Sequence, residues 1–205
     1  MMDKEVRKLV ILGASGHGKV VADIAVKNGY TEIVFLDDNP AVTLCAGYPV
    51  LGPISLLAET EGDVFAAIGN AGIRRKETER FRDRVFPVLV HPGAVIAPDA
   101  VIGAGTVIMA GAVVNPGAVI GKGCIINTCA SVDHDCVLGD YCHVAPGAHL
   151  CGTVSVGAET WIGAGATVSN NLTICGGCMI GAGAVAVKDI TVPGTYIGVP
   201  AGAMR

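Results

Sequence analysis

IGAGTV IMAGAV VNPGAV IGKGCI, residues 102–125, belongs to a six-residue pattern that continues without insertion from Val90 to Val185. All sixteen blocks of six begin with Val, Ile or Leu. The fifth residue of a block is mostly Ala, Cys or Thr, and the larger exceptions are Val154 and Leu172. Such self-similarity indicates a repeat architecture.

A period of six matches neither the 3.6-residue period of a helix nor the alternation of a strand. It fits a solenoid in which each block supplies one short strand and one bend. Three blocks then make a coil, with the branched first residue inside and the small fifth residue leaving room for the next coil. We expect residues 18 apart to stack at about the 4.8 Å spacing of paired strands. A β-sandwich is disfavoured, because it would need strands of uneven length joined by loops.

The first ninety residues lack this repeat. Their order of elements is typical of a nucleotide-binding βαβ unit. We therefore predict a small Rossmann-like α/β domain at residues 1–89, followed by the solenoid at 90–205. The predicted elements are a strand at 9–12, the glycine loop GASGHG at 13–18, a helix at 19–27, a strand at 32–36 followed by two acids, and a strand at 64–68 followed by a basic helical stretch.

The composition is that of a globular protein. Of 205 residues, 51% are hydrophobic, 16% are charged and 29 are glycine, and the net charge is −4. No apolar run approaches the roughly 18 residues of a membrane span, and the first residues lack the order of a signal peptide. No basic run indicates nucleic-acid binding. We therefore expect a cytoplasmic protein whose partners include neither a membrane nor a nucleic acid.

His134 is the strongest candidate for chemistry. It is third in its block, a position expected to point outward, and Asp133 and Asp135 flank it. An imidazole beside a carboxylate suits a general base, because the acid fixes the tautomer and raises the basicity of the ring. The pattern predicts His134 as the base, with a flanking acid, Asp133 or Asp135, as its orienting partner.

The repeats resemble those of the hexapeptide-repeat acyltransferases, whose fold is a left-handed parallel β-helix. GASGHG at 13–18, FLDD at 35–38 and AIGNAGIRRK at 67–76 further resemble the bacterial sugar acetyltransferases of the NeuD and PglD type. The resemblance implies a homotrimer without a metal. It also implies that acetyl moves from acetyl-CoA to the 4-amino group of a UDP-linked 4-amino-4,6-dideoxy sugar, by direct attack of the amine on the thioester.

The same resemblance implies Asp135 as the acid that orients His134. The family often has Glu where this chain has Asp135, so the orienting contact must come from a shorter side chain.

The resemblance also implies which residues bind the nucleotide sugar and acetyl-CoA. Ala164 and Ala182 are 18 apart and should lie one above the other. The nucleotide sugar would contact Ser15, Gly16, His17, Asp37, Asp38 and Gly69, to which we add Arg74. The acetyl-CoA would lie between neighbouring subunits and contact His143, Gly152, Ala164 and Ala182.

Three other functions stay open. The same machinery could O-acetylate a sugar or a sialic acid. A zinc enzyme of the γ-carbonic anhydrase type is a second alternative, because such a site would need three His ligands and the chain offers His134, His143 and His149. However, His143 and His149 are six apart and occupy equivalent slots on neighbouring faces, so the ligand spacing of that family is not reproduced. A non-catalytic nucleotide-sugar-binding protein would leave His134 and its flanking acids unexplained.

The eight cysteines are expected to be free thiols. Cys124, Cys136, Cys142 and Cys178 fall on the small fifth position, where a thiol packs like alanine. Cys124 and Cys142 should stack closely enough for a disulfide, but a reducing cytosol favours thiols. The Cys175–Cys178 pair has no second pair and does not indicate a zinc site.

Overall fold

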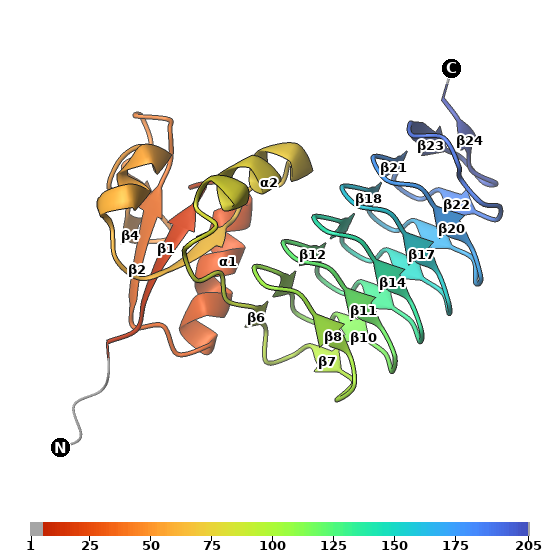
Figure 1. Cartoon of the computed structure of the whole chain (residues 1–205), viewed down its shortest axis with the longest axis horizontal. Helices are drawn as coiled ribbons and strands as arrows, with labels where there is room; N and C mark the ends of the chain where they lie inside the picture. The colour runs from red at the N-terminus through yellow and green to blue at the C-terminus, as the bar shows by residue number, and fades with distance from the viewer. Residues whose placement is uncertain (1–5, 205) are drawn as a thin grey trace. The chain divides into compact units, whose positions relative to one another are not determined.

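The computed structural model describes residues 6–204 (Figure 1). The chain divides into two compact units, Met1–Leu89 and Val90–Arg205. The predicted fold classes are confirmed: the first unit is a small α/β domain and the second is a left-handed parallel β-helix. No helix in the described part of the chain is long and apolar enough to cross a bilayer.

The first unit is built on a parallel sheet with the strand order β2-β1-β5. Val10 pairs with Val34 on one side and Val64 on the other, and all three side chains are buried. The bounds of the main elements are β1 (Lys8–Leu12), α1 (Gly16–Lys27), β2 (Glu32–Leu36), β5 (Asp63–Ala66) and α2 (Ala71–Arg80).

Helix α1 begins at Gly16, three residues before its predicted start, because the second half of the glycine loop is already helical. Two glycines make this turn possible. Gly13 has a left-handed φ of 100°, which glycine adopts without strain. A Cβ on Gly18 would overlap the carbonyl oxygen of Gly13, so the helix packs directly against the end of β1.

The segment between β2 and β5 contains elements that the sequence did not predict. A short antiparallel hairpin joins β3 (Leu44–Cys45) to β4 (Tyr48–Pro49). A 3-10 helix, η1 (Ile54–Glu59), follows. Ile54 and Leu57 of η1 are buried in the same core as the sheet.

The coils of the second unit contribute two-residue strands, paired in parallel, to three sheets, with residues 18 apart in register, such as Val119 with Val137. This confirms three blocks per coil. The first sheet holds β7 (Val95–Ile96), β10 (Val113–Val114), β13 (Ser131–Val132), β16 (His149–Leu150), β19 (Thr167–Val168) and β22 (Val185–Ala186). The second holds β8 (Val101–Ile102), β11 (Val119–Ile120), β14 (Val137–Leu138), β17 (Ser155–Val156) and β20 (Thr173–Ile174). The third holds β6 (Leu89–Val90), β9 (Val107–Ile108), β12 (Ile125–Ile126), β15 (His143–Val144), β18 (Trp161–Ile162) and β21 (Met179–Ile180), and ends with β23 (Thr195–Ile197) and β24 (Gly202–Ala203).

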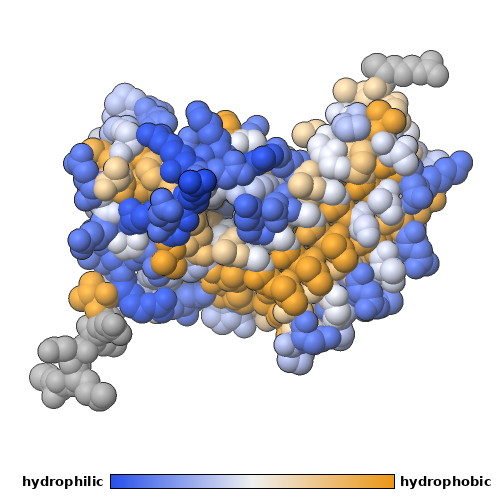
Figure 2. Space-filling view, viewed as in Figure 1, coloured by the Kyte–Doolittle hydropathy of each residue, from blue (hydrophilic) through white to orange (hydrophobic). Residues whose placement is uncertain are grey.

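The second sheet exposes apolar residues on its outer face. Val101, Val119 and Val137 are 57%, 41% and 48% exposed. The register places them one above the other on β8, β11 and β14. Figure 2 shows the apolar surface that crosses the solenoid. We call Val101, Val119 and Val137 the valine stripe.

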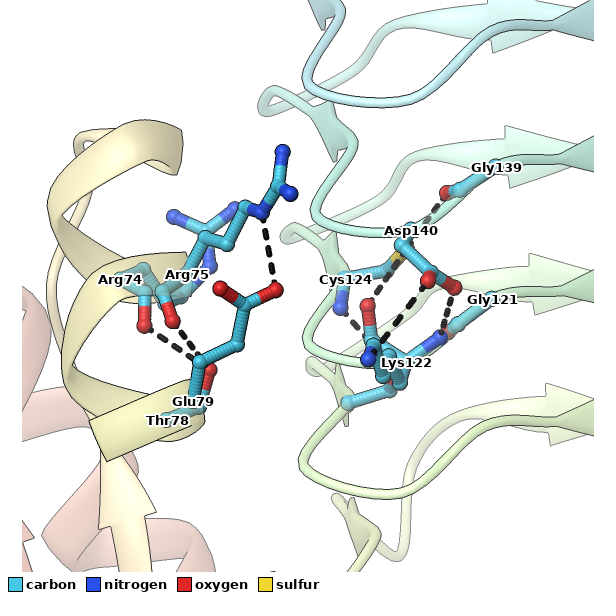
Figure 3. Close-up of polar contacts among 10 residues, drawn as sticks. Arg74, Arg75, Thr78, Glu79, Gly121, Lys122, Cys124, Gly139 and Asp140 are labelled. Atoms are coloured by element: carbon cyan, nitrogen blue, oxygen red, sulfur yellow. Dashed lines mark hydrogen bonds and ion pairs between the residues drawn. The ribbon is translucent and has the colours of Figure 1, made fainter. Parts of the chain in front are cut away.

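The interior of the solenoid is formed by the first and fifth residues of the blocks, as predicted. One column of fifth residues also hydrogen-bonds to the next coil. Thr106 donates to the carbonyl of Gly121 at 2.9 Å. Cys124 donates to the carbonyl of Gly139 at 3.3 Å (Figure 3). None of the eight cysteines forms a disulfide in this structure.

Candidate active site

His134 lies at a corner of the solenoid, in the turn between β13 and β14. Its side chain is 57% exposed, as expected for the third residue of a block. The ring Nδ1 donates a hydrogen bond to Oδ2 of Asp135 at 2.8 Å. Asp135 has a left-handed φ of 58°, a conformation that Asp and Asn adopt more readily than most residues. The short aspartate side chain therefore reaches the ring of its neighbour.

Asp133 has a different task. Its Oδ1 accepts the backbone N–H of His134 at 2.8 Å and the side-chain amide of Asn115, one coil earlier, at 2.7 Å. The Asn115 amide and the His134 N–H hold the pKa of Asp133 below its usual value. Asp133 therefore fixes the backbone of His134, and the ring contact belongs to Asp135.

The acids make His134 a stronger base. The hydrogen bond to Asp135 raises the pKa of His134, and the negative charges of Asp133 and Asp135 contribute to the same rise. With Nδ1–H bonded to a carboxylate, the lone pair of the neutral ring lies on Nε2. The pair can therefore accept a proton at Nε2 and stabilise the resulting imidazolium.

His143 is buried on β15, in contrast to His134. Its Nε2 lies 3.1 Å from the side-chain nitrogen of Asn127. Oδ1 of Asn127 accepts the backbone N–H of Thr128 at 2.8 Å, so the NH₂ group faces the ring and Nε2 accepts the hydrogen bond. This network assigns the proton of the neutral ring to Nδ1. Trp161 contacts the same ring with centroids 4.5 Å apart, so His143 is held in one orientation.

The small residues predicted to contact acetyl-CoA fall on two corners. Gly152 follows β16, one coil after His134, and lies against its ring. Ala164 and Ala182 are exposed after β18 and β21, and the N–H of Gly183 donates to the carbonyl of Ala164 at 2.8 Å. The structure thus brings Gly152 to His134 and stacks the two alanines. Their contact with acetyl-CoA stays a prediction.

The glycine loop and the acidic pair meet at the carboxyl edge of the β2-β1-β5 sheet. Oδ2 of Asp37 accepts the backbone N–H of Ala14 at 2.7 Å. Oδ1 of Asp38 accepts the first backbone N–H of η1 at 2.9 Å. Ser15 and Gly16 are exposed at the N-terminus of α1, where backbone N–H groups suit a phosphate.

Arg74 is buried and shapes the turn after β5. Its Nη1 donates to the carbonyl oxygens of Ile68 and Gly69 at 2.7 and 2.9 Å. Burial and the charge of Arg74 lower the pKa of His17 to about 4, so this ring is neutral near pH 7. Nε2 of His17 is buried and has no hydrogen-bond partner among residues 6–204. Ligand contacts by His17, Gly69 and Arg74 stay predictions.

The histidines of the zinc alternative do not gather at one centre. His143 on β15 and His149 on β16 belong to different sheets. Nδ1 of His149 lies 2.8 Å from the hydroxyl of Ser131. Within the described part of the chain, no group of three His, Cys, Asp or Glu residues could hold a metal ion.

Two family models match the chain: the PglD N-terminal domain over residues 8–81, and six bacterial transferase hexapeptide repeats over residues 117–152. The structure is similar to the acetyltransferase domain of PglB from Neisseria gonorrhoeae FA1090. The sequences are 45% identical, the TM-score is 0.94, and the similarity covers 97% of this chain and 100% of that chain. The chain belongs to the PglD-type hexapeptide-repeat acetyltransferases.

Two further PglD-type relatives differ in the sugar that their names state. PerB from Caulobacter crescentus, in a structure with CoA and GDP-perosamine, is 38% identical with a TM-score of 0.91, over 97% of each chain. UDP-N-acetylbacillosamine N-acetyltransferase of Bacillus subtilis (strain 168) is 36% identical over 113 residues. That match covers 51% of this chain and 52% of the relative, about half the length of each.

The first unit contains a cavity that the sequence did not predict. This cavity of about 480 Å³ lies beside Asp37 and Asp38. Ala46 and Gly47 both have left-handed φ values, and such a pair marks a two-residue hairpin turn. In the sequence, only Gly47 is a residue type that this turn favours. The other lining residues are Asn39, Pro40, Val42, Thr43, Val50, Leu51, Gly52 and Pro53.

Proposed function

We propose that this protein transfers acetyl from acetyl-CoA to an amino group of a nucleotide-linked sugar. The observation that carries the proposal is the His134–Asp135 pair with its 2.8 Å hydrogen bond. The pair lies in a chain that is similar, over 97% of the chain's length, to an acetyltransferase domain in complex with acetyl coenzyme A. We further propose that the acceptor is the 4-amino group of a UDP-linked 4-amino-4,6-dideoxy sugar.

The proposed mechanism needs one base and one oxyanion site. Nε2 of His134 takes a proton from the amine as the amine nitrogen attacks the thioester carbonyl carbon. Asp135 stabilises the imidazolium that forms. Backbone N–H groups of the coils, together with His143, stabilise the oxyanion of the tetrahedral intermediate. The C–S bond then breaks, the amide forms, and the thiolate of CoA receives the proton from His134.

The binding residues divide between the two units. We propose that Ser15, Gly16, His17, Asp37 and Asp38, with Gly69 and Arg74, hold the nucleotide sugar. Small side chains at Gly152, Ala164 and Ala182 would let the pantetheine arm approach backbone amides. The loop at the start of α1 supports a phosphate contact, because helix N-termini bind anions.

The assembly and location are also proposals. We propose a homotrimer in which the valine stripe is covered by a neighbouring subunit, because contiguous exposed apolar surface indicates an interaction site. The eight free thiols support a reducing compartment. We therefore place the protein in the cytoplasm.

Mass spectrometry of reaction products tests the function. The protein is incubated with acetyl-CoA and a small panel of nucleotide-linked amino sugars, matched hydroxy sugars and free sugars. We expect a stable acetamide on the UDP-linked 4-amino sugar. Acetyl esters on hydroxy sugars, with no acetamide on any amino sugar, would favour the O-acetyltransferase alternative.

A further inference from the structure

Gly152 is unlike the other residues of its column. The third residue of the block at this corner is Pro98, Pro116, His134 or Asn170 in the other coils, so a Cβ is generally accommodated there. Gly152 does not have the left-handed φ that would call for glycine. Another feature of the structure must account for the missing side chain.

The imidazole of His134 occupies the space that a side chain at residue 152 would take. A Cβ built on Gly152 would lie against Nε2 of His134, 2.6 Å from Cε1 and 3.1 Å from Cδ2. These three atoms are its nearest neighbours, and real Cβ atoms essentially never approach another heavy atom within 3.0 Å. The ring edge that bears Nε2 therefore rests on the backbone of Gly152.

The ring could move without opening the coil. The carbonyl of Gly152 accepts the N–H of Asn171 at 3.0 Å, and the N–H of Thr153 donates to the carbonyl of His134 at 2.8 Å. Neither bond involves a side chain. Because His134 is exposed, a methyl group at residue 152 would push the rigid ring toward solvent and carry Nδ1 away from Asp135.

We propose that Gly152 is a positioning residue for His134. Its missing side chain lets the ring lie across the next coil, with Nδ1 bonded to Asp135 and Nε2 at the coil edge. The kinetic consequence rests on the proposed acetyl transfer, whereas the orientation of the ring does not. This role differs from a contact with acetyl-CoA, which would affect cofactor binding and leave the titration of His134 unchanged.

The test combines the Gly152→Ala variant with an NMR titration of the histidine rings and steady-state kinetics. We expect the pKa of His134 to fall toward the ordinary value of about 6.5, because the bond to Asp135 is lost. We expect kcat to fall by about tenfold or more, within the range of a positioned base.

The matched control is Gly202→Ala in β24, where an added Cβ would have no heavy atom within 4 Å. This variant should keep both the titration and the kinetics of the wild type. An unchanged pKa of His134 in Gly152→Ala overturns the proposal, whatever happens to activity. If the pKa falls but the wild type transfers no acetyl group, the positioning role stands and the proposed function fails.

A double variant covers the case in which Gly152→Ala does not fold. If the only clash is with the ring, His134→Ala combined with Gly152→Ala must fold and melt near the temperature of His134→Ala alone. Failure of the double variant to fold would show that the glycine is needed by the coil itself, and would overturn the proposal.

Discussion

At the scale of single residues, the geometry of His134 is set by the coils on either side of it. The Asp135 carboxylate occupies space above Gly117, where a Cβ would lie 2.6 Å from Oδ1. Asn115 holds Asp133, which in turn holds the backbone of His134. The orientation of the His134 ring therefore depends on residues of the preceding coil, 18 positions earlier in the chain. Correct stacking of the coils is needed to place the base.

The Asp135→Asn substitution is expected to shift the pH dependence of activity. Asp135 is the main cause of the raised pKa of His134, and the base must be neutral to accept a proton. For the wild type, kcat/KM therefore rises with pH through this raised pKa. In Asp135→Asn the midpoint should move to lower pH, and the plateau should fall by less than in His134→Ala. A pH series of kcat/KM measures both.

Asp99→Asn is the matched control for this shift. Asp99 lies in the same column, two coils before Asp135, and accepts the backbone N–H of Gly117 at 3.0 Å. The control should keep the midpoint of the wild type. A midpoint in Asp135→Asn that stays in place or moves to higher pH contradicts the assigned role of Asp135.

At the scale of elements, the start of α1 is where a nucleotide contact can be tested without disturbing the fold. A Cβ on Gly16 would have no heavy atom within 4 Å, and Gly16 does not have a left-handed φ. Alanine therefore fits the structure at this position. Any loss of binding in Gly16→Ala must come from the ligand that approaches the loop.

We expect Gly16→Ala to raise the KM for the nucleotide sugar about tenfold or more, which corresponds to about 1.4 kcal/mol. The KM for acetyl-CoA should stay nearly constant and serves as the internal control. UDP should compete with the acceptor in the wild type. If UDP does not compete and the KM is unchanged, the first unit does not hold the nucleotide.

The elements also show what the sequence could and could not predict. The period of six predicted the 18-residue register, the buried first residues and the outward position of His134, because each follows from stacking identical coils. The hairpin β3–β4 and η1 were missed, because two-residue strands and a six-residue 3-10 helix are too short to show a periodicity. The same register places residue 152 beside His134, but the direction in which the ring leans depends on its contact with Asp135.

At the scale of the whole molecule, the valine stripe is the feature that a single chain does not explain. The outward residues of β17 and β20 are Ser155 and Thr173, so the stripe is confined to the first three strands of its sheet. A localised apolar surface of this kind indicates a specific interaction site between protein subunits.

We expect light scattering to give three times the chain mass of 20.7 kDa. Val119→Glu should dissociate the trimer, because it places a charge inside the covered stripe. Val26→Glu is the control, since Val26 on α1 is 50% exposed outside the stripe and should leave the mass unchanged. A wild-type monomer at micromolar concentration, or a trimeric Val119→Glu, contradicts the assignment of this surface.

The proposed acetyl transfer depends on His134 as its base. The most direct measurement is kcat for the nucleotide-linked amine in the wild type and in His134→Ala, each with its assembly confirmed by light scattering. We predict that kcat falls by about 10² to 10⁴, the usual contribution of a positioned base, while the oligomeric state is unchanged. A correctly assembled variant with a kcat close to that of the wild type would show that His134 is not the base.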